Sequence, residues 1–376
     1  MNIKKKIALA AIPAVMALSA TDASSKVLLM SDNGWEVSFD GAANAFYTAT
    51  STGSMETLGV YNQYTTGGET AASNIMLADA GAGNANVVAG TFQNLESGSD
   101  VSSISVGLLP NVWGFTVKAP TKNGLDVSGR LGLYTHMNAN GNSADNNVIN
   151  IRETSLTVAG SFGSVLMGRS LGIHNSNAIL NDMTLFGVGV AAGNVNGTTL
   201  GRIGVGYVYA DWYPQITWTT PGLGPIGAKI GILQATPLQS STGADATNTK
   251  YPRVEAQLDY SFELGGLGGY VWVDGQYQNL DRTLGESQLY EARNNASTGG
   301  GVARTAIDDD QADGVEVGGV GFGTRLTFQG FKLVASGFYN HGLGMQFQGN
   351  IAGGYSGSLD ERGKARHFYG GYIQGT

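Results

Sequence analysis

The chain has 376 residues, of which 58 are glycine, none is cysteine and only 13% are charged; its formal net charge is −8. Without cysteine, a disulfide scaffold and a cysteine-ligated metal site are excluded. The acidic balance argues against a nucleic-acid partner, which would call for a basic surface. Beyond the amino terminus, no apolar run approaches the roughly 18 residues that a membrane-spanning helix needs.

The amino terminus has the three parts of a secretory signal peptide. Lys4, Lys5 and Lys6 form a positive segment, an apolar stretch runs from Ile7 to Leu18, and small residues follow up to Ala23. We therefore expect residues 1–23 to direct export through the Sec pathway and residues 24–376 to form one domain. A buried amino-terminal helix is the alternative.

Segments that alternate between polar and apolar residues follow along the chain, as in half-buried β-strands. In chain order, the predicted strands are Trp35–Tyr47, Val112–Pro120, Leu125–Met137, Val148–Gly160, Ser164–Ser170, Val205–Thr220, Ile226–Ala235, Arg253–Leu264, Gly269–Asn279, Val315–Phe328, Lys332–Asn340 and Ala365–Thr376.

The segment Arg253–Leu264 shows this alternation without a single exception. Its apolar face carries Val254, Ala256, Leu258, Tyr260, Phe262 and Leu264, and its polar face carries Arg253, Glu255, Gln257, Asp259, Ser261 and Glu263. Successive side chains of a strand point to opposite faces, and a tilted strand crosses a membrane with about 9–11 residues. The segment thus has the pattern and the length of a membrane-spanning β-strand.

The connections between these segments alternate between short and long. Short ones lie near residues 121–124, 161–163, 221–225, 265–268 and 329–330, and long ones near 48–111, 138–147, 171–201, 236–251, 280–314 and 341–364. Outer-membrane barrels have short periplasmic turns and long extracellular loops, whereas a soluble all-β fold has no reason to separate loops by length. We predict an all-β, transmembrane antiparallel β-barrel with about twelve strands present.

The strand around Arg152 breaks the alternation. Arg152 shares its parity with the apolar Leu156 and Val158, which would place a charge on the apolar face. A β-bulge would explain the irregularity, and so would burial of this face against another subunit; the sequence leaves both open.

Three motifs around this region resemble those of the Gram-negative general porins. Ser164–Gly172 resembles the strand end with Gly-Arg that precedes the constriction loop of that family, and Asn181–Gly187 resembles the loop's acidic tip and Phe-Gly signature. Arg152–Leu156 with Gly160–Gly163 resembles the preceding hairpin. Together with the strand order, the resemblance covers most of the chain after the signal peptide.

The resemblance implies a sixteen-stranded barrel that forms a homotrimer and whose third long loop, here residues 171–201, folds inward and narrows the channel. In such a channel, acidic loop residues face basic residues on the opposite wall. The positions that match this pore constriction are Asp182 on the loop, Lys118, Arg130 and Arg152 on the wall, and Arg169 at the foot of the loop.

The sequence departs from the family at two places. A second loop acid would fall near Leu185, which is neutral, so a cation preference is not implied. The family ends on a strand with a terminal aromatic residue, whereas this sequence stops at Thr376. The expectation is a member truncated at its carboxyl terminus; a complete twelve-stranded barrel is the alternative.

The predicted function is a water-filled channel of the cell outer membrane for passive diffusion of small hydrophilic solutes and ions, in contact with outer-membrane lipid. Such a channel needs no cofactor, metal or catalytic residue. An adhesin or receptor built on the long loops is an alternative, and a lipid-hydrolysing barrel is another, although none of His136, His174, His341 and His367 stands in a motif with serine. The acidic cluster Asp308–Asp313 is interpreted as a solvated loop, because its spacing does not fit a calcium loop.

Overall fold

The structure, a computed structural model of the chain, describes residues 27–51, 62–63, 88–89, 100–105, 107–135, 149–185, 201–222, 224–238, 246–249, 251–282, 314–344, 358–359 and 364–376. The predicted signal peptide, His136, the Phe-Gly pair at 186–187 and the Asp308–Asp313 cluster lie outside these residues.

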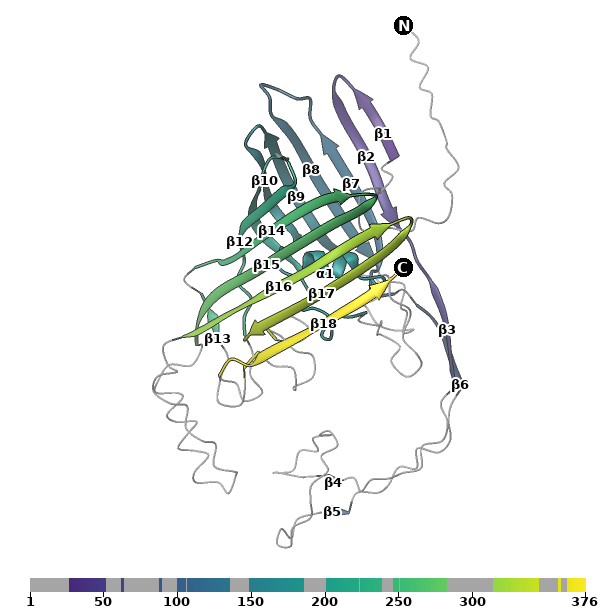
Figure 1. Cartoon of the computed structure of the whole chain (residues 1–376), viewed down its shortest axis with the longest axis vertical. Coiled ribbons are helices and arrows are strands. Elements are labelled where there is room, and N and C mark those ends of the chain that lie inside the picture. Colours follow the sequence, from purple (N-terminus) through teal and green to yellow (C-terminus); the bar gives the residue numbers. More distant parts are fainter. Residues whose placement is uncertain are drawn as a thin grey trace.

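One large sheet, in which every neighbouring pair of strands is antiparallel, forms the wall of the molecule (Figure 1). Thirteen strands follow one another along it: β1 (Val27–Asp32), β2 (Trp35–Ala42), β7 (Asn111–Lys118), β8 (Asp126–Thr135), β9 (Asn150–Gly160), β10 (Gly163–Leu171), β11 (Trp212–Thr219), β12 (Ile226–Leu233), β14 (Arg253–Leu264), β15 (Leu267–Arg282), β16 (Val315–Phe328), β17 (Phe331–His341) and β18 (His367–Gly375).

The remaining elements are small. β13 (Ala246–Asn248) pairs with β15, β3 (Phe46–Ser51) pairs with β6 (Asp100–Ser105), and β4 (Asn62–Gln63) pairs with β5 (Val88–Ala89). The helix α1 comprises Ser176–Asn181. Within the described part of the chain, no helix is long and apolar enough to cross a membrane.

The strand predictions agree with this sheet in most places. Arg253–Leu264 and Val315–Phe328 match β14 and β16 from end to end. Three differences stand out. The segment from Val205 becomes a strand only at Trp212, and β1 was missed. The strand predicted as Trp35–Tyr47 ends at Ala42, and Tyr47 belongs to β3. β1 and β2 are joined by Asn33-Gly34, whose φ angles of 50° and 82° are those of a tight hairpin turn, for which Asn-Gly is the strongest sequence signal.

The two faces of the wall differ as the alternation predicts. On β14, Val254 and Leu258 are 40% and 52% exposed, whereas Arg253 and Glu255 are fully buried. The register carries this division across the sheet, so large apolar side chains line the outer face of each following strand, as Val273, Phe322 and Ile373 do. A soluble sheet would bury its apolar face; an apolar exterior around a polar interior defines a membrane-spanning barrel wall.

Short and long connections alternate along the whole wall. Two-residue turns join β9 to β10 at Ser161-Phe162, β14 to β15 at Gly265-Gly266 and β16 to β17 at Gln329-Gly330. Connections of fourteen residues or more leave the opposite ends of these strands, as between β8 and β9 or β17 and β18. The short turns therefore gather at one end of the wall (Figure 1).

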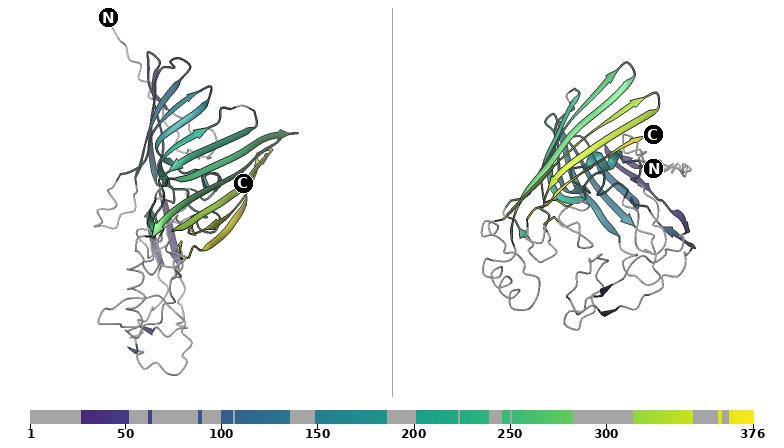
Figure 2. Two further views of the ribbon diagram at one scale, coloured as in Figure 1. Left: turned by 90° about the vertical axis from the view of Figure 1, so that its left-hand side faces the viewer. Right: turned by 60° about the horizontal axis from the view of Figure 1, so that its bottom comes forward.

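The described strands form a curved wall with two edges, β1 and β18 (Figure 2). Because every step along the thirteen strands is antiparallel, the first and the last strand run in the same direction. Closing this wall with antiparallel pairs throughout requires an odd number of further strands between β18 and β1. An unpaired edge is costly in lipid, since each unsatisfied backbone group there costs several kcal/mol.

Candidate functional site

The connection between β10 and β11 is the third long connection of the wall, and it folds into the interior. Its described parts are residues 172–185, which include α1, and residues 201–211. Figure 2 shows α1 inside the curve of the wall, and α1 contacts β16 on the far side. The described parts of this loop therefore lie on the inner side of the wall.

Two carboxylates of the far wall hold the start of this loop. Glu255 on β14 accepts hydrogen bonds from the backbone N–H groups of Ile173 and His174, the latter at 2.9 Å. Asp274 on β15 accepts one from the backbone N–H of Asn175 at 2.8 Å and contacts His174 Nδ1 at 2.7 Å. The side chains of His174 and Asp274 are both fully buried. We call Ile173, His174, Asn175, Glu255 and Asp274 the loop anchor.

Small residues on β16 make room for the anchor. A Cβ atom at Gly321 would lie 2.5 Å from Asn175 Oδ1, and one at Gly319 would lie 1.9 Å from Asn340 Oδ1. Asn340 in turn contacts His174 Nε2 at 3.3 Å. Gly319 and Gly321 thus leave space on the inner face for the loop.

The helix and its end are held by β18. The Tyr372 hydroxyl donates a hydrogen bond to the carbonyl of Ala178 at 2.7 Å. The Gln374 side chain bridges two loop groups: it donates to the carbonyl of Asn181 at 2.6 Å and accepts from the backbone N–H of Met183 at 3.0 Å. The loop therefore crosses the interior from β10 to the last described strand.

Asp182, predicted as an acid facing the channel, has a different role in the structure. Its side chain is fully buried, and its carboxylate forms an ion pair with Arg202. It also accepts hydrogen bonds from the hydroxyls of Tyr207 and Thr184, both at 2.7 Å. Burial, and then the neighbouring carboxylate, raise the pKa of Tyr207, so its hydroxyl keeps the proton that it donates. Asp182 joins the two described parts of the loop instead of presenting a free charge.

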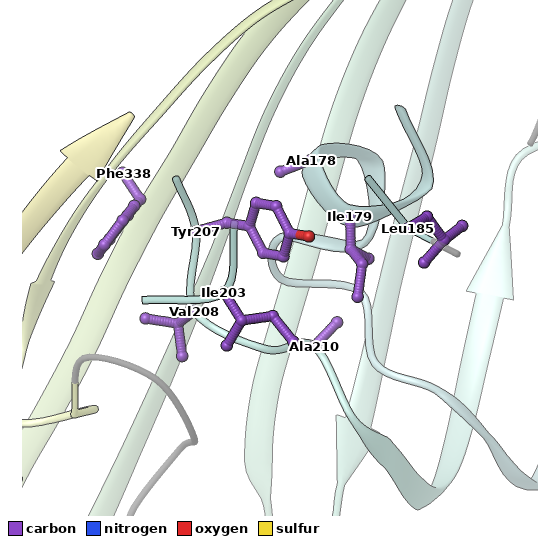
Figure 3. Close-up of a cluster of buried hydrophobic side chains, with 8 residues drawn as sticks. All are labelled: Ala178, Ile179, Leu185, Ile203, Tyr207, Val208, Ala210 and Phe338. Atoms are coloured by element: carbon purple, nitrogen blue, oxygen red, sulfur yellow. The ribbon is translucent and has the colours of Figure 1, made fainter. Parts of the chain in front are cut away.

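Apolar side chains add to this joint. Ile203, Tyr207, Val208 and Ala210 of the returning segment pack with Ala178, Ile179 and Leu185, and with Phe338 of β17 (Figure 3). The neutral Leu185, noted in the sequence as a missing acid, is part of this cluster. Inside a polar barrel, an apolar cluster of this kind gives the loop its own small core and a defined position.

Arg130 lies on the inner face of the opposite wall, as predicted. Its guanidinium bonds Asp40 on β2 at 2.9 Å and Glu153 on β9 at 3.3 Å. A Cβ atom at Gly114 would lie 2.5 Å from the guanidinium, so that glycine gives Arg130 space to lie flat over the sheet. Arg130 is thus paired with two acids that the sequence analysis did not assign.

Arg152 points inward because of a β-bulge. The register between β8 and β9 shifts between Gly132, which lies opposite Glu153, and Leu133, which lies opposite Ile151, so Arg152 is the extra residue. Its guanidinium lies 4.9 Å from the ring centroids of both Tyr134 and Trp212. Of the two explanations that the sequence left open, the bulge is the one that the structure shows.

Lys118 and Arg169 lie apart from this group. Lys118 is the last residue of β7, beside the short turn, although it shares the inner face with Arg130. Arg169 lies opposite Thr154 and has the same parity as the outward-facing Met167. The prediction that Arg169 lines the constriction is therefore wrong, because strand alternation turns its side chain to the outer face.

The far wall offers a basic residue close to the loop. Arg325 on β16 stacks on the ring of Tyr270 with a distance of 5.1 Å to the ring centroid, and it donates to Asn181 Oδ1 at 3.3 Å. Arg202, on the loop itself, was missed by sequence analysis. Its only sequence signal is a basic residue at the end of a long loop, which does not reveal that the chain returns to Asp182.

A curved antiparallel β-wall with an apolar outer face and a loop on its inner side is the architecture of a membrane β-barrel. No protein family and no curated protein matches this sequence. Similar solved structures include the outer membrane channel DcaP of Acinetobacter baumannii (15% identity, covering 83% of this chain and 66% of that one, TM-score 0.45).

Two further similar structures are an anion-selective porin from Comamonas acidovorans (15% identity, 65% of this chain and 62% of that one, TM-score 0.40) and Salmonella typhi OmpF in complex with daunomycin (13%, 83% and 67%, TM-score 0.41). The chain thus spans about two thirds of the length of these channels. At such identities and TM-scores no function carries over, so the functional argument rests on the geometry of this chain.

Proposed function

We propose that this protein is an outer-membrane porin, a water-filled channel for passive diffusion of small hydrophilic solutes and ions. The observation that supports the proposal is the loop anchor, which holds residues 173–175 against the inner face of a wall with an apolar exterior. Export through a signal peptide, assembly as a homotrimer and contact with outer-membrane lipid belong to the same proposal.

The proposed constriction lies between the loop and the near wall. On the wall side stand Arg130, which is paired with acids, and Arg152, which lies against aromatic rings. On the loop side stand the Asp182–Arg202 pair and the neighbouring Arg325. Fixed charges at a narrow point set the selectivity of a channel, so the charges that solutes would meet are the guanidinium groups of these arginines, while the buried Asp182 acts by neutralising Arg202.

Two requirements follow from this proposal. The bore must be closed, so the edge strands β1 and β18 must each pair with another strand. The protein must also act by passive diffusion and not by catalysis. His174 and Asp274 form a pair of the kind found in hydrolases, but both side chains are fully buried, so no substrate reaches them. That burial favours the channel over a lipid-hydrolysing enzyme.

The test is single-channel recording of the purified full-length protein in planar lipid bilayers. We expect stepwise, ohmic conductance increases, because a wet channel passes ions in proportion to voltage. Membrane insertion without any conductance step would reject the channel and favour the adhesin or receptor alternative, which requires no open bore.

Arg130 provides a charge-selectivity prediction. In Arg130→Gln, Asp40 and Glu153 lose their common cationic partner, so the reversal potential in a salt gradient should shift toward cations. The matched control is Arg169→Gln, which removes the same charge from the outer face and should leave the reversal potential unchanged. Equal shifts in both variants would show that the inner and outer faces are assigned wrongly.

A further inference from the structure

Two histidines meet on the outer face of the wall, where β17 ends and β18 begins. His341 is the last residue of β17 and His367 is the first residue of β18, and the register places them directly opposite each other. The long connection between these strands leaves from the same point. The pair therefore lies at the end of the wall from which the long connections leave, outside the bore.

The two imidazole rings are close enough to share a ligand. Their centroids lie 4.4 Å apart, and His341 Nδ1 lies 3.3 Å from His367 Nε2. Two nitrogens that bind one tetrahedral zinc ion at 2.0–2.1 Å are separated by roughly 3.3–3.4 Å. His341 Nδ1 also lies 3.4 Å from His367 Nδ1, so a small rotation of either ring decides which nitrogen faces it, and the spacing of the two rings matches that of two ligands of one ion.

The side chain of Tyr339 orients His367 for metal binding. The Tyr339 hydroxyl lies 2.7 Å from His367 Nδ1. When Nδ1 carries the ring proton and donates it to the Tyr339 oxygen, Nε2 keeps a free lone pair. Metal-binding histidines commonly donate their second nitrogen to an oxygen in this way, which fixes the tautomer and raises the basicity of the binding nitrogen.

From these contacts we propose that His341 and His367 form a binding site for a divalent transition-metal ion, with Tyr339 as the positioning residue. Imidazole nitrogen suits zinc, copper and nickel. In the described part of the chain no group of three or more histidine, aspartate or glutamate residues gathers, so water completes the coordination. The bound ion joins β17 to β18 at the root of their long connection.

The affinity of this site for metal ions should follow the general preferences of nitrogen ligands, whether or not the channel conducts. Cu²⁺ should bind more tightly than Ni²⁺ or Zn²⁺, as for nitrogen ligands in general. Binding should weaken on acidification, because protons compete with the metal ion for the imidazole nitrogens.

The experiment titrates the full-length protein in detergent micelles with Cu²⁺ and records its electron paramagnetic resonance spectrum, with calorimetry for Ni²⁺ and Zn²⁺. We expect one ion per chain with hyperfine coupling to two nitrogens. His341→Gln and His367→Gln should each remove the two-nitrogen signal, and Tyr339→Phe should keep it while weakening binding about tenfold.

The control variant His136→Gln removes a histidine outside this pair and should bind as the original protein does. Circular dichroism of each variant verifies that the barrel remains folded. Retention of the two-nitrogen spectrum in His341→Gln, or an equal loss in His136→Gln, would overturn the site, as would the absence of saturable Cu²⁺ binding. None of these results bears on whether the bore conducts ions.

Discussion

Asp274→Ala is expected to raise the single-channel conductance of the full-length protein and to make its open current noisier. Asp274 accepts the backbone N–H of Asn175 and pairs with His174 in a fully buried site. Without this carboxylate, the start of the loop loses both bonds and is held on the far wall by Glu255 alone, so it moves more freely and the bore widens.

The expected magnitude follows from burial. Removing one partner of a buried pair costs about 3–5 kcal/mol, because the other partner stays behind without compensation, whereas an exposed pair is worth about 0–1 kcal/mol. The cost falls on the loop, since β15 keeps its backbone pairing with β14 and β16 on both sides. A loosened loop in an intact wall is the result.

Recordings of Asp274→Ala and Asp259→Ala in parallel check this expectation. Asp259 is an acid on the inner face of the adjacent β14, and its carboxylate accepts a hydrogen bond from Gln257 at 2.8 Å on the same strand. Both variants lose one negative charge from the interior, but only the first removes a bond to the loop. Equal conductance in the two variants would reject the anchor as the element that sets the bore.

The second large effect is expected from the pair Asp182 and Arg202. In Asp182→Asn the ion pair of Arg202 is lost, so the loop gains one net positive charge and the reversal potential should shift toward anions. The hydroxyls of Tyr207 and Thr184 bond different oxygens of Asp182, so asparagine accepts from one of them and donates its NH2 group to the other. The apolar cluster around Tyr207 is unchanged, so we expect the loop to stay in place.

Arg202→Gln should shift the reversal potential in the opposite direction and should also loosen the loop. It leaves the carboxylate of Asp182 buried and without its cationic partner, at a cost of about 3–5 kcal/mol. The double variant Asp182→Asn with Arg202→Gln removes both charges and should restore the original reversal potential. An unchanged potential in Asp182→Asn would mean that permeating ions do not pass this point.

The sequence by itself determined most strands of the wall and the faces to which their side chains point. Strict alternation in Arg253–Leu264 predicted both faces of β14, because a strand must turn successive side chains to opposite sides whatever its neighbours are. The alternation of short and long connections predicted the barrel and its two ends, because connection lengths are also visible along the sequence without knowledge of the strand pairing. The motif that resembled a porin constriction loop also predicted that loop 171–201 folds inward, although it did not reveal how the loop is held.

At irregular positions, the direction of a side chain became clear only from the pairing with the neighbouring strand. The parity of Arg152 placed it with apolar residues, and only the register shift opposite Gly132 and Leu133 shows that a bulge turns it inward. Arg169 obeys the alternation and therefore points outward, although its motif suggested a place at the constriction. Motif position and strand geometry gave different answers there, and the geometry decides where a side chain points.

Contacts between distant segments were decided by the tertiary structure alone. In the sequence Glu255 is one charge on a polar strand face and Asp274 carries no distinguishing signal, yet they hold Ile173, His174 and Asn175, which lie about 80 to 100 residues earlier. His341 and His367 are 26 residues apart and become neighbours through the register of β17 and β18. Alternation is a local property that one strand displays by itself, whereas an anchor or a metal pair depends on how the whole sheet curves and in which register its strands align.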